Sequence, residues 1–130
     1  MKSLKQIVYN NQLAFARHLL AKVKKDYGFT LDGKDFEQKQ YTGGYQVSVE
    51  DVFLIDVKDL TPESLLNDYL APMYIRNKNE YDIGMWLDGG KVYLDYSVNV
   101  PDLERALALG REYNQQMLYD WANDDFIPVK

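Results

Sequence analysis

The sequence predicts an α+β fold in which amphipathic helices pack on a small antiparallel sheet. Three observations support this fold class. Apolar residues recur at three- or four-residue steps over residues 3–26, alternate with polar residues on both sides of Gly89-Gly90, and return to helical spacing after Pro101. The first and last patterns are typical of amphipathic helices, and the middle one is typical of a β-hairpin.

Composition limits the number of domains. The chain has 130 residues, of which 46% are hydrophobic, and this suits one compact core. We therefore expect a single domain over residues 1–130, with a basic helix in 1–27 and an α+β body in 41–130. The chain has no cysteine, so disulfides and cysteine-ligated zinc are excluded.

The long N-terminal helix is predicted over about residues 3–26. Ser3 and Gln6 have the spacing of a capping box, and Gly28 is placed to end the helix. The apolar row of this helix packs in the core or, as in other basic amphipathic helices, contacts a membrane or a partner. The row consists of Leu4, Val8, Phe15, Leu19 and Val23.

Two strands are predicted in the next part of the chain. Residues 28–44 are rich in Gly, Asp, Lys and Gln, which indicates an irregular segment. Residues 45–49 then alternate between apolar and polar side chains as a half-buried strand does. Residues 52–57 are apolar enough for a second strand.

A short middle helix is predicted after the strands. Thr61 is a suitable N-cap and Pro62 suits the first helical position. We expect the helix to stop at Pro72, because proline lacks the backbone N–H that a helix interior requires. Residues 73–80 are expected to form a linker or a short strand.

The register of the hairpin follows from its two-residue turn. Gly89 and Gly90 supply the positive φ angles that such a loop demands, so Asp88 faces Lys91 in an ion pair. Side chains alternate between the two faces, which places one apolar set on the buried face. This set consists of Ile83, Met85, Leu87, Val92, Leu94, Tyr96 and Val98.

The C-terminal amphipathic helix is predicted over about residues 101–121 and is expected to pack on the sheet. Ala106 and Gly110 lie four residues apart, which lets this helix approach the sheet closely. Residues 126–129 can add an edge strand or a packed tail.

No residue pattern predicts a catalytic or metal centre. His18 is the only histidine, so we assign it a structural role among apolar neighbours on the first helix. Asp32 and Asp35 lie in a Gly-containing loop, but their spacing departs from that of a calcium loop. No serine has nucleophile-elbow glycines around it. We therefore expect no catalytic residue, no metal and no cofactor.

The second face of the hairpin is the candidate binding surface. An aromatic pair lies there beside a carboxylate and a gap at Gly84, and exposed aromatic residues are enriched at interfaces. The alternative is that a helix or the 28–44 loop covers this face. An Asn-Gln pair on the predicted last helix is a further candidate for contact with a ligand or a neighbouring strand. The candidate residues are Trp86, Tyr93, Asp95, Ser97, Asn114 and Gln115.

Charge is distributed unevenly along the chain. Six of the 15 basic residues and none of the 20 acidic residues fall in residues 1–25, so residues 26–130 carry nine basic residues and a charge of −11. Phosphates are repelled by such a body, so nucleic acid is disfavoured as a partner except at the basic helix 2–25. No apolar run suits a signal peptide or a membrane span, and we expect a cytoplasmic protein.

Four motifs suggest a biological setting. They are Gly44-Tyr45-Gln46-Val47-Ser48, Gly84-Met85-Trp86-Leu87-Asp88-Gly89-Gly90, Tyr93-Leu94-Asp95-Tyr96-Ser97, and the run from Ala106 to Asn114-Gln115 with Tyr119-Asp120. Over about residues 41–127 their order resembles small uncharacterised accessory proteins of bacterial phages and other mobile elements. Met85 and Tyr96 depart from the usual pattern of that group. The resemblance implies a setting in a bacterial host and no catalytic residues.

Two classes of function follow. The first is a non-enzymatic protein–protein interaction module, such as an anti-CRISPR or anti-restriction inhibitor, that binds and occludes a host or phage protein. Its acidic surface either mimics nucleic acid or only keeps the protein in solution. The second is a small-ligand binder or enzyme that uses Trp86, Tyr93 and Asp95, and it predicts a concave pocket that contains a carboxylate of perturbed pKa. A weaker third class has the basic helix dock on nucleic acid or anionic lipid.

Overall fold

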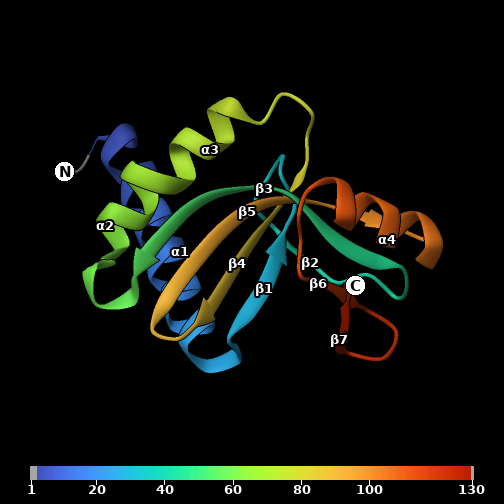
Figure 1. Ribbon diagram of the computed structural model, residues 1–130. Helices are drawn as coiled ribbons and strands as arrows, with labels where there is room; N and C mark the ends of the chain where they lie inside the picture. Colours follow the sequence, from blue (N-terminus) through green and yellow to red (C-terminus); the bar gives the residue numbers. More distant parts are fainter. Residues whose placement is uncertain (1–2, 130) are drawn as a thin grey trace.

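The computed structural model confirms an α+β fold and describes residues 3–129 (Figure 1). Lys2 and the side chains of Lys5 and Val8 lie outside the described residues. The antiparallel sheet has seven strands in the order β2-β1-β4-β5-β3-β6-β7. The strands are β1 (Gly28–Leu31), β2 (Gln38–Lys39), β3 (Tyr45–Asp56), β4 (Asp82–Asp88), β5 (Lys91–Val100), β6 (Met117–Asp120) and β7 (Asp125–Pro128).

Helix α1 (Leu4–Asp26) and the segment from α2 (Pro62–Ser64) to α3 (Ala71–Arg76) lie together against one part of the sheet, and α4 (Leu103–Glu112) lies apart from them at the other end (Figure 1). Within residues 3–129 no helix is long and apolar enough to cross a membrane. The remaining helical elements are the 3-10 turn η1 (Val57–Asp59) and the π-helix η2 (Leu65–Leu70).

Helix α1 begins at its predicted cap, but Gly28 does not end it. The Oγ of Ser3 accepts the backbone N–H of Gln6 at 3.1 Å. The left-handed residue at the other end is Tyr27, with φ 66°. Gly28 instead begins β1, where a Cβ would lie 1.9 Å from Cε3 of Trp86. A glycine is required there because the indole of Trp86 lies against its backbone.

The segment 28–44 is not irregular as predicted, since it contains β1 and β2. Strand β1 pairs with β4 from Gly28↔Trp86 to Leu31↔Ile83, and its residue Phe29 is buried. Strand β1 has only four residues, which is too short to show a clear alternation of apolar and polar side chains. Its strand conformation depends on pairing with β4, and composition does not reveal that pairing.

The two strands predicted at 45–49 and 52–57 form one long strand, β3. It pairs with β5 along its length, with register shifts between Ser48 and Glu50 and between Asp51 and Phe53. Such bulges bend a strand and increase its twist. They give the sheet much of its curvature.

The middle helical segment passes through Pro72 instead of stopping there. Thr61 and Ser64 form a capping box, as the N-cap prediction required. Pro72 lies in the first turn of α3, directly after the π-helical η2, and a residue without a backbone N–H is tolerated in that position. Residues 73–76 are therefore helical and not part of a linker.

The hairpin has the predicted register. Gly89 and Gly90 have φ angles of 58° and 76°, and the pairs run from Asp88↔Lys91 to Ile83↔Tyr96. Most of the predicted apolar face is buried, with Leu87 and Val98 only partly so. Among the described residues, however, Asp88 and Lys91 form no ion pair. Both residues are exposed at the end of the hairpin, where an ion pair contributes little to stability.

Helix α4 ends well before the predicted residue 121. Asn114 has a φ of 58°, and the next N–H, of Gln115, binds the carbonyl of Gly110 at 2.8 Å. This arrangement is typical of a helix end with a left-handed asparagine. The chain then forms β6 and, as predicted for the C-terminal tail, the edge strand β7. A Cβ on Gly110 would lie 3.0 Å from Val129, so the predicted close approach is present.

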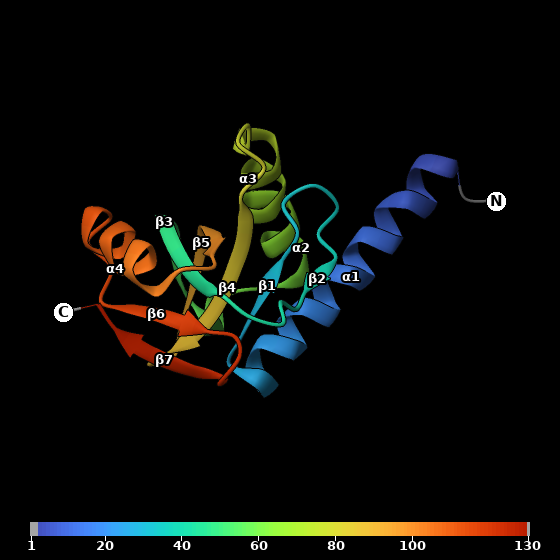
Figure 2. The same cartoon turned by 90° about the vertical axis from the view of Figure 1, so that its right-hand side faces the viewer.

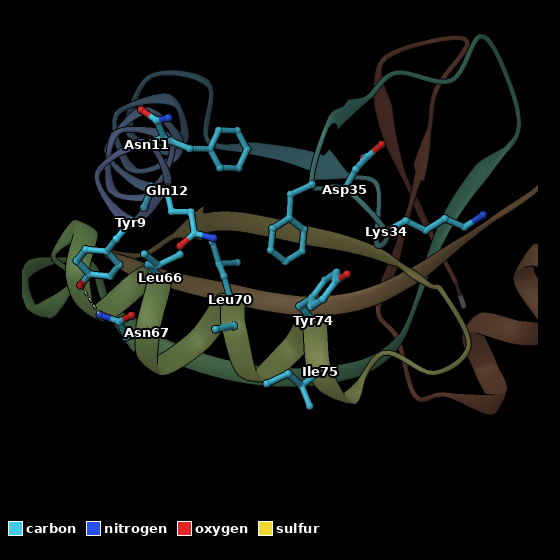
Figure 3. A pocket seen from close by; sticks show the side chains of 14 residues that line it. Tyr9, Asn11, Gln12, Lys34, Asp35, Leu66, Asn67, Leu70, Tyr74 and Ile75 are labelled. Atoms are coloured by element: carbon cyan, nitrogen blue, oxygen red, sulfur yellow. Dashed lines mark hydrogen bonds between the residues drawn. The ribbon is translucent and has the colours of Figure 1, made fainter. Parts of the chain in front are cut away.

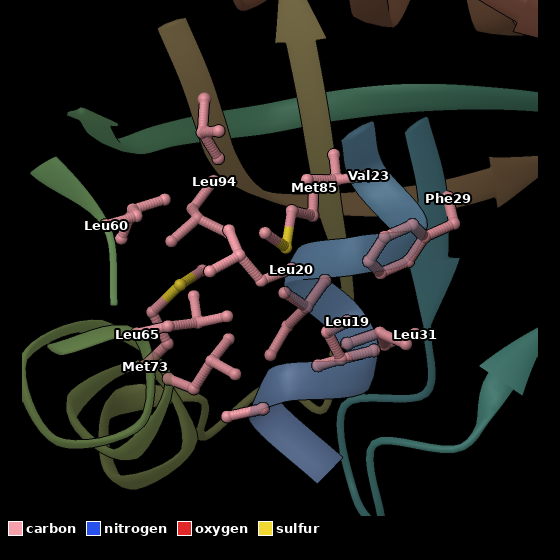
Figure 4. Packing of buried hydrophobic residues seen from close by; sticks show 14 of the residues in the cluster. Leu19, Leu20, Val23, Phe29, Leu31, Leu60, Leu65, Met73, Met85 and Leu94 are labelled. Atoms are coloured by element: carbon pink, nitrogen blue, oxygen red, sulfur yellow. The ribbon is translucent and has the colours of Figure 1, made fainter. Parts of the chain in front are cut away.

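Two hydrophobic clusters attach the helices to the sheet. In the first, α1 and the segment from η2 to α3 cover the buried face of the hairpin, where Leu20 and Met73 lie close to Leu94 (Figure 4). The second lies beneath α4 and consists of Val47, Ala106, Leu118 and Val129.

The opposite face of the sheet is concave. In the strand order β5 and β3 separate β4 from the β6–β7 hairpin. Even so, the ring of Trp86 on β4 lies 6.1 Å from Tyr119 and 5.9 Å from Phe126, measured between centroids. Figure 2 shows the β6–β7 hairpin at the end of the sheet opposite α1. The sheet is therefore a curled half-barrel with Trp86 inside the curl.

Candidate functional site

The concave face contains a cavity of about 140 Å³, which we call the concave pocket. This is smaller than the ~300 Å³ and upward of sites for drug-sized ligands, and close to the roughly 150 Å³ of a cavity that holds benzene. The pocket therefore fits a group of a few heavy atoms. The lining residues are Gln46, Ser48, Trp86, Asp95, Ser97, Gln115, Met117, Leu118, Tyr119 and Phe126.

Asp95 is the most distinctive lining residue. It lies within β5, is 7% exposed, and its Oδ1 has no hydrogen-bond partner among the described residues. Burial raises the pKa of Asp95 to about 7, and the carboxylate of Asp51, which faces it across the β3–β5 pairing, adds to the rise. Hydrogen bonding to Ser48 and to the backbone of Gly84 opposes it. The carboxyl therefore keeps its proton to a higher pH than an exposed aspartate does.

Gly84 makes room for the carboxyl of Asp95. A Cβ at Gly84 would lie 2.3 Å from Oδ1 of Asp95 and 2.7 Å from Nε1 of Trp86. On the other side of Gly84 the register places Thr30, whose Oγ1 is the second buried side-chain oxygen without a hydrogen-bond partner in the described part of the chain. Two unpartnered oxygens therefore flank one glycine. Such atoms are rare because each costs about 1–3 kcal/mol.

A neighbouring carboxyl, that of Asp82, is partnered by contrast. Its Oδ2 accepts hydrogen bonds from the hydroxyl of Tyr41 at 2.6 Å and from Nε2 of Gln46 at 3.0 Å. The amide of Gln46 also donates to Oγ of Ser97 at 2.9 Å and accepts from Nε1 of Trp121 at 3.0 Å. This buried network satisfies its own members. Within residues 3–129, the buried carboxyl oxygen that still lacks a hydrogen bond is therefore Oδ1 of Asp95 in β5.

Aromatic rings form one wall of the concave pocket. The centroids of Trp86, Tyr119 and Phe126 lie 5.5–6.1 Å apart, with the rings tilted or edge-on to one another. The hydroxyl of Tyr119 donates to the carboxylate of Asp124. Burial, together with this hydrogen bond, raises the pKa of Tyr119 to about 12, so the ring stays neutral. The pocket thus combines neutral π-systems with one carboxyl.

Four of the six predicted binding residues line the concave pocket: Trp86, Asp95, Ser97 and Gln115. Tyr93 lies on the same face but outside the lining, and Asn114 is exposed at the end of α4, where it terminates the helix. The cover over Trp86 comes from the β6–β7 hairpin, and not from a helix or the 28–44 loop.

The sequence patterns do not identify the remaining lining residues, above all Gln46, Tyr119 and Phe126. The helical pattern predicts Tyr119 on the last helix, but that helix ends before it. The useful signal was Asn114, a residue that favours the left-handed conformation, followed by closely spaced aromatic residues. Gln46 shares the polar alternation of β3, which does not reveal which strand lies opposite.

The other sequence candidates lie outside the concave pocket. His18 is exposed on α1, so its predicted place among apolar neighbours is wrong. Asp32 accepts the N–H of Lys34 at 2.8 Å and pairs with Lys39, which makes it part of a turn. Within residues 3–129 no group of three side chains is arranged to hold a metal ion.

A second concavity, the helical groove, lies between α1, the β1–β2 loop and the segment from η2 to α3 (Figure 3). It has a volume of about 570 Å³ and a mostly apolar lining. Tyr74 and Ile75 are 54% and 76% exposed at its edge. The Tyr9 hydroxyl accepts a hydrogen bond from Asn67 at 3.1 Å and joins the two walls. The groove leaves apolar surface open to solvent.

The chain matches no protein-family model, no curated protein and no solved structure. The case for a function therefore rests on the concave pocket and the helical groove.

Proposed function

We propose that the protein is a small-ligand binder whose site is the concave pocket. The observation that carries this proposal is the buried carboxyl of Asp95, which lines a cavity and whose Oδ1 has no hydrogen-bond partner within residues 3–129. A buried carboxyl oxygen without a hydrogen-bond partner weakens folding, and titratable groups with perturbed pKa values concentrate at functional sites. A ligand that donates a hydrogen bond to Oδ1 of Asp95 would offset the free-energy cost of burying that atom without a partner.

The lining of the concave pocket supports the same proposal. Ligand sites combine mostly apolar and aromatic walls with a few convergent polar groups. Here the walls come from Trp86, Leu118 and Phe126, while Ser97 and Gln46 supply polar atoms beside Asp95. Gln46 and Ser97 are held in place by their own hydrogen bond, which preorganises that side of the site.

We expect small fragments to bind the concave pocket and to be blocked by Gln115→Trp. Gln115 lines the pocket, and the larger indole would occupy it. The measurement is the shift of the Trp86 indole N–H resonance in a two-dimensional NMR titration with fragments of up to about ten heavy atoms.

Gln116→Trp is the matched control, because Gln116 is exposed next to the pocket and does not line it. It should bind the fragments as the unaltered chain does. If no fragment shifts Trp86, or if both variants lose binding equally, the concave pocket is not the site.

The protein–protein interaction module is a second candidate, and the helical groove favours it. Apolar grooves between helices accept the apolar face of a partner helix. Residues 4–25 of α1 contain basic residues and no acid, so charge complementarity favours a partner helix whose flanks are acidic. The phage setting implied by the resemblance belongs with this candidate.

For this candidate we expect Ile75→Asp to abolish capture of a partner from bacterial lysate. Leu54→Asp is the control, because Leu54 is a 55% exposed apolar residue on β3, away from the groove. The captured protein should contain an acidic amphipathic helix that binds as an isolated peptide. Equal capture by both variants would assign the interaction to another surface.

A further inference from the structure

We infer that the ligand of the concave pocket is a small organic cation, an alkylammonium or guanidinium head group, with Asp95 as its counter-ion. The inference rests on the proposed function and names the chemical class of the ligand. Three features of the pocket support it: its charge, its aromatic wall and its size.

The charge of the concave pocket is negative. Among residues 3–129, its lining contains the carboxyl of Asp95 and no lysine or arginine. Asp51 faces Asp95 across β3 and β5, and like charges placed directly opposite repel each other. The ion pairs of the described residues all lie elsewhere. A bound cation offsets the repulsion and supplies the donor that Oδ1 lacks, whereas an anion increases the repulsion.

The aromatic wall favours an organic cation over a metal ion. Ring faces attract cations, and the contact is strongest for weakly hydrated groups such as guanidinium and alkylammonium. A hard metal ion requires several oxygen ligands, and only one carboxyl lines the pocket. The rings of Trp86, Tyr119 and Phe126 instead supply a neutral surface of the kind that binds alkylated ammonium groups.

Size and hydrogen-bond geometry restrict the ligand further. A cavity of about 140 Å³ accepts one head group and excludes nucleotides and sugars. A guanidinium carries several N–H donors, which matches the acceptors that surround Asp95, the hydroxyls of Ser48 and Ser97. The head group can belong to a free amine or guanidine, or to a basic side chain of a peptide.

Titration of the full chain with matched probes tests this inference. Methylguanidinium is compared with methylurea, its neutral near-isostere, at pH 8 and constant ionic strength, with the Trp86 indole resonance as the readout. We expect methylguanidinium to bind at least about tenfold more tightly, which is the effect of a desolvated cation–π contact together with a charge-assisted hydrogen bond. A capped arginine peptide in a parallel titration distinguishes a side chain from a free ligand.

Asp95→Asn should remove the preference for the cation, while Asp88→Asn should keep it. The second variant is the matched control, because it changes net charge equally at the exposed end of the hairpin. If methylurea binds as tightly as methylguanidinium, the cation inference is wrong and the small-ligand proposal stands. If neither probe, nor any fragment of the earlier screen, shifts Trp86, both are wrong.

Discussion

Asp95→Asn is expected to stabilise the protein at pH 8 by at most about 4 kcal/mol, which is the cost of ionising Asp95 in the folded chain. The pKa of Asp95 is about 7 in the folded chain and 3.8 in the absence of the fold, and a pKa difference of one corresponds to ~1.4 kcal/mol. Between about pH 4 and pH 7 the folded chain keeps a proton that the unfolded chain has released. The free energy of unfolding therefore falls as pH rises through this window and levels off above it. Asparagine has no proton to lose.

Thermal unfolding at several pH values measures this effect. At pH 8 the melting temperature of Asp95→Asn should exceed that of the unaltered chain by at most on the order of 10 °C, and the difference should shrink towards pH 4. Asp82→Asn is the control with the opposite sign, because the Asp82 carboxylate accepts hydrogen bonds from Tyr41 and Gln46. If Asp95→Asn destabilised the chain at pH 8, as we expect of Asp82→Asn, then both oxygens of the Asp95 carboxylate would be stabilised by the fold, and the prediction would be wrong.

The ionised carboxylate of Asp95 lowers the stability of the fold, and this is relevant to the proposed function. A residue that weakens folding is retained where binding recovers the loss. A cation in the concave pocket should therefore raise the melting temperature of the unaltered chain, and should do so most above pH 7, where the carboxylate is ionised. Both the lower stability above pH 7 and the affinity for a cation would then result from the same atom, Oδ1 of Asp95.

Local patterns were sufficient to predict the hairpin and four of the ten residues that line the concave pocket. Gly89 and Gly90 determine the turn, and side chains that alternate with a period of two then place Trp86, Asp95 and Ser97 on one face. Each step needs only neighbouring residues. Gln115 is predicted as a binding residue for a different reason: it follows Asn114 as an adjacent polar pair on the predicted last helix. That helix in fact ends just before the pair.

The other six lining residues depend on contacts between parts of the chain that are far apart in the sequence. Strand β1 is a strand because β4 pairs with it, and the β6–β7 hairpin covers Trp86 because bulges in β3 curl the sheet. No window of ten or twenty residues contains that information. The same holds for Pro72, where an unusual π-helical segment lets the helix continue through a residue that normally stops it.

Leu94→Ala is expected to lower the free energy of unfolding by about 3–4 kcal/mol, the second large effect. Leu94 is fully buried on β5 and packs in the core cluster beneath α1, and removing a buried leucine side chain costs roughly 2–5 kcal/mol, the more so where the cavity cannot collapse. Leu54→Ala is the matched control. Leu54 faces Tyr93 on the neighbouring strand but is 55% exposed, so its truncation should cost about 0.5 kcal/mol or less.

Urea denaturation of both variants measures the difference, and an unchanged slope would show that the unfolded states are comparable. The comparison also tests the division of the hairpin into two faces. If β5 were shifted by one residue, Leu94 would point into the concave face and its truncation would be mild, because a one-residue slip exchanges the faces of every side chain in a strand. The Asp95 carboxyl would then lie in the hydrophobic core. A large loss of stability for Leu94→Ala and a small one for Leu54→Ala would thus place Leu94 in the core. Asp95, the next residue along the strand, would then lie on the concave face, where a ligand can bind it.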